Sequence, residues 1–331
     1  MQSPYTPAPR PLPSGIRGFN IGPSPANFGT SNYVWSALYS DWANSWPFLK
    51  LQVDLAASVG ANTIRLIGDV YGIAHGMFTR AQYLARVGQV IAYCQSKGLQ
   101  FYATAGGAPH YACSTDVIVA ESVAYAGFVA GFPNVIAVDL CQEAWTCVAA
   151  GTAYDASGNY TSPISGSAMT TMMQQLKAGT RQVAPNLPLT FSAYGTDVLT
   201  DGVWASSIRP IGVDFFDGHL YVTNPSAAEF ANLKASVGGI PILFGECGCE
   251  PGSVLAAGAQ AAAINGQKTL LTRTDVAGSL VWCAINTNQS NTRYFGVWNP
   301  DGSPVADRVA ACETYPSQPA SLPTRHRRRH A

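Results

Sequence analysis

Apolar residues along this chain fall into short runs that alternate with longer amphipathic segments. The short runs predict buried strands, and the longer segments predict helices because their apolar residues recur every three to four positions. The predicted strands span residues 16–21, 62–67, 99–104, 134–140, 187–192, 213–221, 242–245 and 279–285. The predicted helices span residues 41–59, 79–97, 116–131, 167–183, 227–237, 258–271 and 304–312.

This alternation predicts the fold. Short connections between strands and helices imply parallel strands joined by right-handed crossovers, and eight such units close most economically into a barrel. We therefore predict an α/β fold, a single (β/α)8 TIM barrel, over residues 15–312. Residues 1–14 form a Pro-rich arm that we expect to be extended and poorly packed. Residues 313–331 form a Pro-, Arg- and His-rich tail that we expect to be disordered, with anion or cell-surface binding as a hypothesis. A loop is expected between the first strand and the first helix.

The composition narrows the classes of partner. Of 331 residues, 47% are hydrophobic and 11% are charged, so the chain can bury a large core. Because 19 Lys and Arg balance 19 Asp and Glu, nothing indicates a nucleic-acid or polyanion partner. No apolar run of about 18 residues or more occurs, so no membrane span is expected. The N-terminus lacks the basic-then-apolar order of a secretory signal, and the oligomeric state is not indicated.

Eight cysteines are too few to define a disulfide scaffold in a chain of this length. Their spacing, including Cys247-Gly248-Cys249, lacks the paired Cys-x-x-Cys ligands of a typical zinc site, so no metal is expected. Cys113 and Cys147 fall in loops predicted after consecutive strands, which leaves a disulfide between them open. The other cysteines are expected to fill the core.

Two of the predicted strands end in a glutamate. Glu143 follows the fourth strand, and Glu246 follows the seventh. A carboxylate at the end of a buried strand is either a structural ion-pair partner or a reacting group. In a (β/α)8 barrel, the carboxyl ends of the strands meet at the face that holds the active site. Strand alternation groups Glu143 with Asp139 and Cys141, and Glu246 with Phe244, so both carboxylates are expected to face the interior.

Two carboxylates opposed across a barrel mouth suit the cleavage of glycosidic bonds. One carboxylic acid protonates the leaving oxygen, while the other, ionised, attacks the anomeric carbon and forms a covalent intermediate that water removes. This retaining chemistry predicts carboxyl groups about 5 to 5.5 Å apart. It requires no metal and no organic cofactor.

The order of these residues resembles the retaining (β/α)8 glycoside hydrolases of the clan that includes the family 5 cellulases and mannanases. In that clan the acid/base glutamate ends strand four, after an asparagine, and the nucleophile ends strand seven. The resemblance covers residues 15–312 and implies Glu143 as acid/base and Glu246 as nucleophile. Gln142 stands where the clan has the asparagine that contacts the sugar 2-hydroxyl, so this contact is expected to differ.

The resemblance also implies substrate-binding residues. Arg65 on strand two matches an arginine that orients the nucleophile. His219 and Tyr221 on strand six match a His-x-Tyr pair that lines the cleft, and Trp282 on strand eight matches an aromatic platform under the sugar. His110 falls several residues later than the clan's histidine after strand three.

Each of these residues has a structural alternative. Arg65 could pair with Asp69 or Asp139 instead of the nucleophile. Tyr221 could be a core aromatic instead of a hydrogen-bond donor that keeps Glu246 ionised.

The remaining candidates have structural alternatives of the same kind. His219 could simply satisfy backbone groups. Trp282, Trp145 and Trp35 could be packing residues, although aromatic rings at a barrel mouth suit a saccharide chain.

The sequence therefore predicts a retaining glycoside hydrolase acting on an oligo- or polysaccharide. The resemblance implies β-glucan and β-mannan as the first substrates to test. Two alternatives stay open. Gln142 and the displaced His110 are compatible with a non-catalytic carbohydrate-binding barrel. The Pro-rich arm, the basic tail and the missing signal suit an extracellular or virion-associated component that recognises or degrades bacterial cell-wall glycans.

Overall fold

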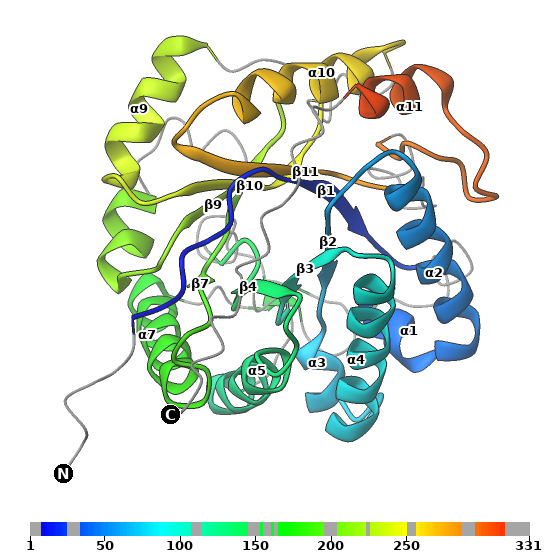
Figure 1. Cartoon of the computed structure of the whole chain (residues 1–331). Helices are drawn as coiled ribbons and strands as arrows, with labels where there is room; N and C mark the ends of the chain where they lie inside the picture. The colour runs from blue at the N-terminus through cyan, green and yellow to red at the C-terminus, as the bar shows by residue number, and fades with distance from the viewer. Residues whose placement is uncertain are drawn as a thin grey trace, which may run out of the picture.

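A computed structural model describes residues 8–24, 34–106, 114–144, 153–154, 160–161, 165–194, 204–222, 226–249, 256–285 and 295–314. Parallel strands form a closed barrel within a ring of helices (Figure 1). Around the barrel the strands are β1 (Ile16–Ile21), β2 (Thr63–Ile67), β3 (Gln100–Thr104), β4 (Val135–Asp139), β7 (Leu189–Thr190) with β8 (Ala193–Tyr194), β9 (Phe216–Leu220), β10 (Ile242–Cys247) and β11 (Val276–Val281). β7 pairs with β4 and β8 pairs with β9, so these two short strands together form the fifth strand; β11 pairs with β1 and closes the barrel. The predicted (β/α)8 fold is confirmed.

All seven predicted helices are present. They are α2 (Trp42–Ser58), α4 (Arg80–Ser96), α5 (Thr115–Val129), α7 (Gly166–Val183), α9 (Ala227–Val237), α10 (Ala259–Leu271) and α11 (Ala306–Glu313). Side-chain caps fix several starts: Thr79 and Ser226 each form a capping box with the residue three positions later. None of the described helices has both the length and the apolar character needed to cross a membrane.

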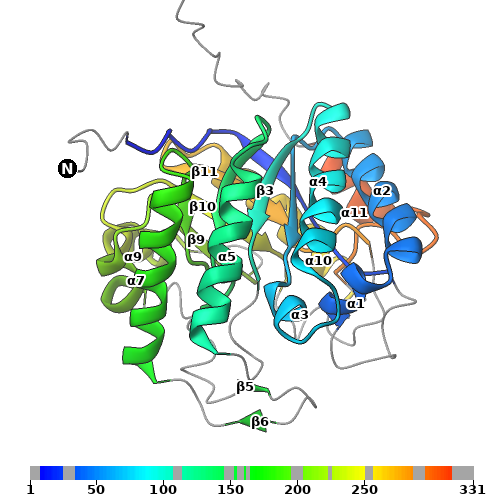
Figure 2. The same cartoon turned by 90° about the horizontal axis from the view of Figure 1, so that it is seen from below.

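Several short elements were not predicted. The loop expected after the first strand includes the helix α1 (Val34–Ser40), and α3 (Val70–Ala74) follows β2 with Asp69 as its N-cap. A π-turn (Trp204–Ile208) runs into a 3-10 turn (Arg209–Ile211). The antiparallel pair β5 (Ala153–Tyr154) and β6 (Tyr160–Thr161) lies apart from the barrel strands at one end of the molecule (Figure 2). Elements this short carry too few residues to show a hydrophobic period.

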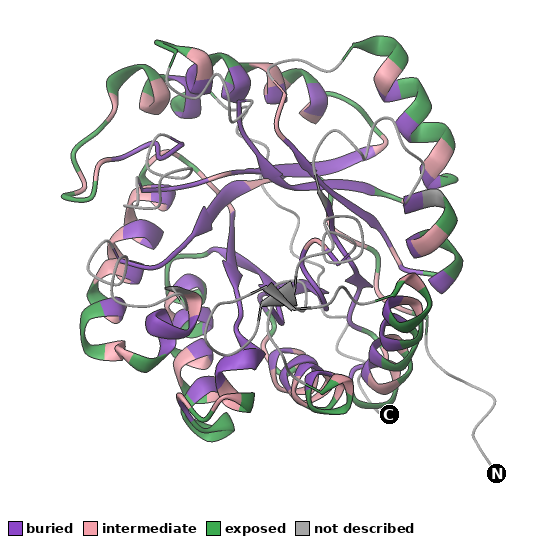
Figure 3. Cartoon of the chain, turned by 180° about the vertical axis from the view of Figure 1, so that it is seen from behind, coloured by how far each residue is buried: buried purple, intermediate pink, exposed green. Residues whose placement is uncertain are grey.

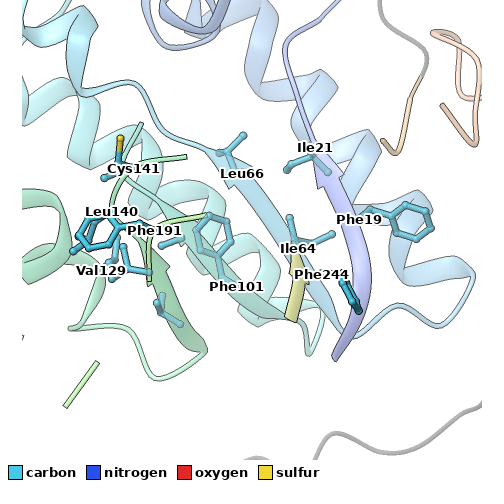
Figure 4. Packing of buried hydrophobic residues seen from close by; sticks show 14 of the residues in the cluster. Phe19, Ile21, Ile64, Leu66, Phe101, Val129, Leu140, Cys141, Phe191 and Phe244 are labelled. Atoms are coloured by element: carbon cyan, nitrogen blue, oxygen red, sulfur yellow. The ribbon is translucent and has the colours of Figure 1, made fainter. Parts of the chain in front are cut away.

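The core lies mainly between the strands and the helices. The strands are buried along their length, and the helices bury the side that faces the barrel (Figure 3). Phe19, Ile21, Ile64 and Leu66 of the neighbouring strands β1 and β2 pack together in this layer (Figure 4). Burying one such side chain contributes roughly 1.5–3 kcal/mol, so this layer holds the barrel in shape.

Part of the N-terminal arm is tied to the barrel. The Arg10 backbone N–H donates to the carbonyl oxygen of Asn186 at 3.1 Å, and the Arg10 guanidinium donates to the carbonyl oxygen of Val135 at 2.6 Å. Leu12 packs against the apolar cluster inside the barrel. Arg10 and Leu12 thus attach this part of the arm to the barrel, although none of residues 8–14 is buried. Residues 1–7 and 315–331 lie outside the described residues.

Candidate active site

Glu246 is held by side chains from three other places in the barrel. Its Oε1 accepts hydrogen bonds from Arg65 Nη1 at 2.7 Å and from Gln142 Nε2 at 2.9 Å. Its Oε2 accepts one from the Tyr221 hydroxyl at 2.7 Å. Glu246 is only 2% exposed, so these donors replace the water that its carboxylate loses on burial. The arrangement fixes both carboxylate oxygens in place.

An irregularity in β10 turns Glu246 inward. The register between β10 and β9 shifts between Leu243 and Glu246. As a result, Phe244 packs in the core layer between the strands and the helices, here called the outer cluster, while Glu246 faces Arg65. The expectation that Glu246 and Phe244 share a face is therefore wrong, because an irregularity breaks the alternation of the strand. A Cβ at Gly245 would collide with the Asp217 carboxylate, to which the Gly245 N–H donates at 2.7 Å.

Arg65 is the cation at the centre of the barrel. It is fully buried and pairs with both Glu246, at 2.7 Å, and Asp139, at 3.2 Å, and it also donates to Asn20 Oδ1 at 2.8 Å. Arg65 thus pairs with two of the three acids that the sequence analysis considered, Glu246 and Asp139. The third, Asp69, is the N-cap of α3. Burial disfavours the charge of Arg65, but the Glu246 and neighbouring aspartate carboxylates outweigh burial and raise its pKa. Burial raises the pKa of Asp139 to about 6.

Glu143 lies next to Glu246 and is linked to it through His219. The side chain of Glu143 is 20% exposed, and its Oε1 lies 2.7 Å from Nδ1 of the buried His219, which lies 3.4 Å from Glu246 Oε2. One oxygen of each carboxylate and one ring nitrogen of His219 all lie within 4.8 Å of one another. Burial disfavours the imidazolium, but the charges of Glu246 and Glu143 outweigh burial and raise the pKa of His219. The site therefore holds one buried and one accessible carboxylate.

The backbone changes direction after β4. Glu143 has φ of +51°, in the left-handed region, which costs a non-glycine residue about 1–2 kcal/mol. Cys141 packs in the outer cluster with Leu140, so it does not share a face with Asp139 as strand alternation predicted. The alternation fails because β4 ends at Asp139. Gln142 Oε1 is buried and receives no hydrogen bond from the described part of the chain.

Aromatic residues lie close to Glu246: Tyr221 donates to it, and the Trp282 N–H donates to the carbonyl oxygen of the adjacent Cys247 at 2.8 Å. Trp35 of α1 packs against Trp282, which directly follows β11, with ring centroids 6.3 Å apart, and both rings are partly exposed. The peptide bond between Trp282 and Cys283 is cis. The Tyr221 ring packs edge-on against Phe295, and burial together with the nearby Glu246 charge raises the pKa of Tyr221 well above its usual value, so it stays a hydrogen-bond donor. Other sequence-predicted residues lie outside the described residues: Trp145, His110, Cys113 and Cys147.

The same cluster has the ligand types of a metal site. Glu143, His219 and Glu246 each offer one donor atom. A cation there would have to replace the contact between His219 and Glu143, and it would lie near the positive charge of Arg65. The arrangement therefore suits proton transfer and nucleophilic attack better than cation binding.

No protein-family profile matches this chain. No curated protein sequence matches it either. Solved structures are nevertheless similar to it. An exo-β-1,4-mannosidase, Op5Man5 from Opitutaceae bacterium strain TAV5, is 16% identical with a TM-score of 0.64; the match covers 90% of this chain but only 58% of that protein.

Two further structures match over most of both chains. GH5_18 from Streptomyces cattleya, solved in complex with GlcNAc, is 13% identical with a TM-score of 0.66, covering 93% of this chain and 82% of its own. An endo-1,4-β-mannanase from Eisenia fetida is 13% identical with a TM-score of 0.62, covering 94% and 92%. The chain thus has the (β/α)8 barrel fold of these solved structures, which carry the names of a mannosidase, a GH5_18 protein and a mannanase.

Proposed function

We propose that this protein is a retaining glycoside hydrolase with Glu143 as acid/base and Glu246 as nucleophile. The observation that carries this proposal is the short separation of the two carboxylates, because one oxygen of Glu143 and one of Glu246 lie within 4.8 Å of each other. Retaining enzymes place the two carboxyl groups about 5–5.5 Å apart, whereas inverting enzymes need about 6.5–9.5 Å to admit a water molecule between carboxylate and sugar. The separation thus favours direct attack by Glu246.

The different surroundings of the two glutamates support the division of roles. Buried Glu246 is oriented by Arg65, Gln142 and Tyr221, so it can attack the anomeric carbon without first being desolvated. The more accessible Glu143 protonates the leaving oxygen as that bond breaks. After the leaving group departs, Glu143 takes a proton from water, which attacks the glycosyl ester and releases Glu246.

We propose an oligo- or polysaccharide with β-mannosidic linkages as the first substrate to test, and β-glucans as the second. Two of the similar structures carry mannosidase or mannanase names. The adjoining rings of Trp282 and Trp35 offer an apolar surface for a sugar face. An extracellular or virion-associated location stays a prediction from the sequence.

Release of reducing ends from β-mannans, β-glucans and bacterial cell-wall glycans tests the proposal. The intact protein is expected to release sugar from at least one of these, and Glu246→Gln from none. Glu313→Gln is a matched control, because Glu313 is an exposed glutamate at the end of α11. Binding of a glycan without hydrolysis by the intact protein would contradict the proposal and favour a non-catalytic barrel.

A further inference from the structure

The backbone of Glu143 is held by one residue on the neighbouring strand. The Glu143 N–H donates to Ser192 Oγ at 2.9 Å, and the next N–H, of Ala144, donates to the Ser192 carbonyl oxygen at 3.2 Å. Glu143 is also the only non-glycine residue with positive φ among the described residues. The hydroxyl of Ser192 therefore meets the backbone of the proposed acid/base at its strained position.

Ser192 is itself fixed by Asp139. Ser192 is fully buried between β7 and β8; its hydroxyl donates to Asp139 Oδ2 at 2.7 Å and its N–H donates to Asp139 Oδ1 at 3.2 Å. Because the hydroxyl proton is committed to Asp139, a lone pair of the same oxygen is directed to the Glu143 N–H. One orientation of the hydroxyl thus satisfies both neighbours.

The same aspartate connects to the proposed nucleophile. Asp139 Oδ2 lies 3.2 Å from Arg65 Nη2, and Arg65 Nη1 lies 2.7 Å from Glu246 Oε1. A continuous series of hydrogen bonds therefore runs from the Glu143 backbone through Ser192, Asp139 and Arg65 to Glu246. Every side chain in this series other than that of Glu143 is buried.

We propose that Ser192 is a positioning residue for Glu143: its hydroxyl holds the left-handed backbone of Glu143 and thereby aims the carboxylate at the leaving-group oxygen. This inference rests on the proposed function. With alanine at 192, the pairing of the Ser192 carbonyl with Ala144 stays, but the Glu143 N–H loses its acceptor. The backbone of Glu143 then relaxes from its strained conformation, and its carboxylate leaves the position needed for proton transfer.

The dependence of rate on the leaving group tests this role. A disaccharide needs its leaving oxygen protonated, whereas a dinitrophenyl glycoside of the same sugar does not. Ser192→Ala is expected to lower kcat/KM about ten- to a hundredfold for the disaccharide, part of the roughly 10²–10⁴-fold that general acids supply, and less than about threefold for the dinitrophenyl glycoside. Ser192→Cys, with a weaker acceptor of similar shape, is expected to give an intermediate loss on the disaccharide.

Thr190→Ala is the matched control. Thr190 lies two residues earlier on the same barrel strand and is also fully buried, but its hydroxyl donates to the Phe215 carbonyl oxygen at 2.8 Å. The Thr190→Ala substitution removes a buried hydroxyl but leaves the contact between Ser192 and Glu143 in place. The ratio of kcat/KM for the disaccharide to kcat/KM for the dinitrophenyl glycoside should therefore equal that of the intact protein.

Equal losses on both substrates in Ser192→Ala, or the same selective loss in Thr190→Ala, would overturn the inference. Circular dichroism and thermal melting establish that each variant is folded. If Ser192→Ala does not fold, the selective loss on the disaccharide is required of Ser192→Cys, and its absence there overturns the inference. An intact protein inactive on every glycoside would overturn the proposed function instead, and the role of Ser192 with it.

Discussion

Replacing Arg65 with methionine removes the cation that two buried carboxylates share. Arg65 is fully buried, at 2.7 Å from Glu246 and 3.2 Å from Asp139, and both acids are themselves buried. Methionine keeps a long unbranched side chain in this space but carries no charge. The variant therefore isolates the electrostatic contribution of Arg65 better than a truncation to alanine.

The expected loss of stability depends on pH, because an unpaired carboxylate can take up a proton. Removing one partner of a buried ion pair costs about 3–5 kcal/mol. Protonating a carboxylate of reference pKa about 4.3 costs about 1.36 kcal/mol per pH unit above that value, or about 4 kcal/mol near pH 7 and about 1 kcal/mol near pH 5. Asp139, with its pKa already raised to about 6 by burial, adds little at the lower pH. We expect Arg65→Met to lose about 4–5 kcal/mol near pH 7 and about 1–2 kcal/mol near pH 5.

Urea unfolding, followed by tryptophan fluorescence at both pH values, measures these losses. Arg65→Lys is the control, because it keeps the charge while losing the planar fork that reaches both acids. It should lose less than Arg65→Met near pH 7 and depend less on pH. An Arg65→Met loss below about 1 kcal/mol near pH 7, or equal losses at the two pH values, would refute this reasoning.

Three further predictions concern neighbouring side chains. Tyr221→Phe removes the 2.7 Å hydrogen bond to Glu246 and should lower kcat/KM about tenfold; unchanged kinetics would contradict its role. Because burial raises the pKa of Asp139 to about 6, the folded protein binds a proton at Asp139 more tightly than the unfolded chain does. This proton stabilises the fold below about pH 4, and the stabilisation is lost as the pH rises to about 6. Urea unfolding should therefore show Asp139→Asn gaining about 3 kcal/mol relative to the intact protein over this range, and a constant difference would count against the shift. Trp282→Ala should raise KM more than it lowers kcat in steady-state kinetics, since its ring adjoins that of Trp35 where a sugar would stack; a fall in kcat alone would argue against a binding platform.

Strand and helix alternation was the part of the fold that the sequence could predict. Each barrel unit is long enough for its hydrophobic period to show, and α9 was predicted with its observed bounds. The short helices α1 and α3 were missed because five to seven residues do not show a period. The irregularity at Gly245 was also missed, since it depends on the approach of Asp217 from the adjacent strand.

The residues of the candidate site that lie within or at the ends of strands could be predicted from the sequence. Glu143, Glu246 and Arg65 are charged residues in or after apolar runs, which is a local signal. The role of Ser192 has no such signal, because it depends on the left-handed backbone of Glu143 and on the neighbouring strand. Asn20, which accepts from Arg65, could have been noticed as a polar residue inside a predicted strand.

The most direct measurement identifies the residue that becomes covalently attached to the sugar. A 2-deoxy-2-fluoro glycoside with a good leaving group, made from the sugar that the protein hydrolyses, slows breakdown of the glycosyl intermediate so that it accumulates. After proteolysis, mass spectrometry should find the fluoroglycosyl group on the peptide that contains Glu246, and no such adduct with Glu246→Gln. Attachment to another residue, or hydrolysis with inverted anomeric configuration and no adduct, would contradict the assignment of Glu246 as the nucleophile.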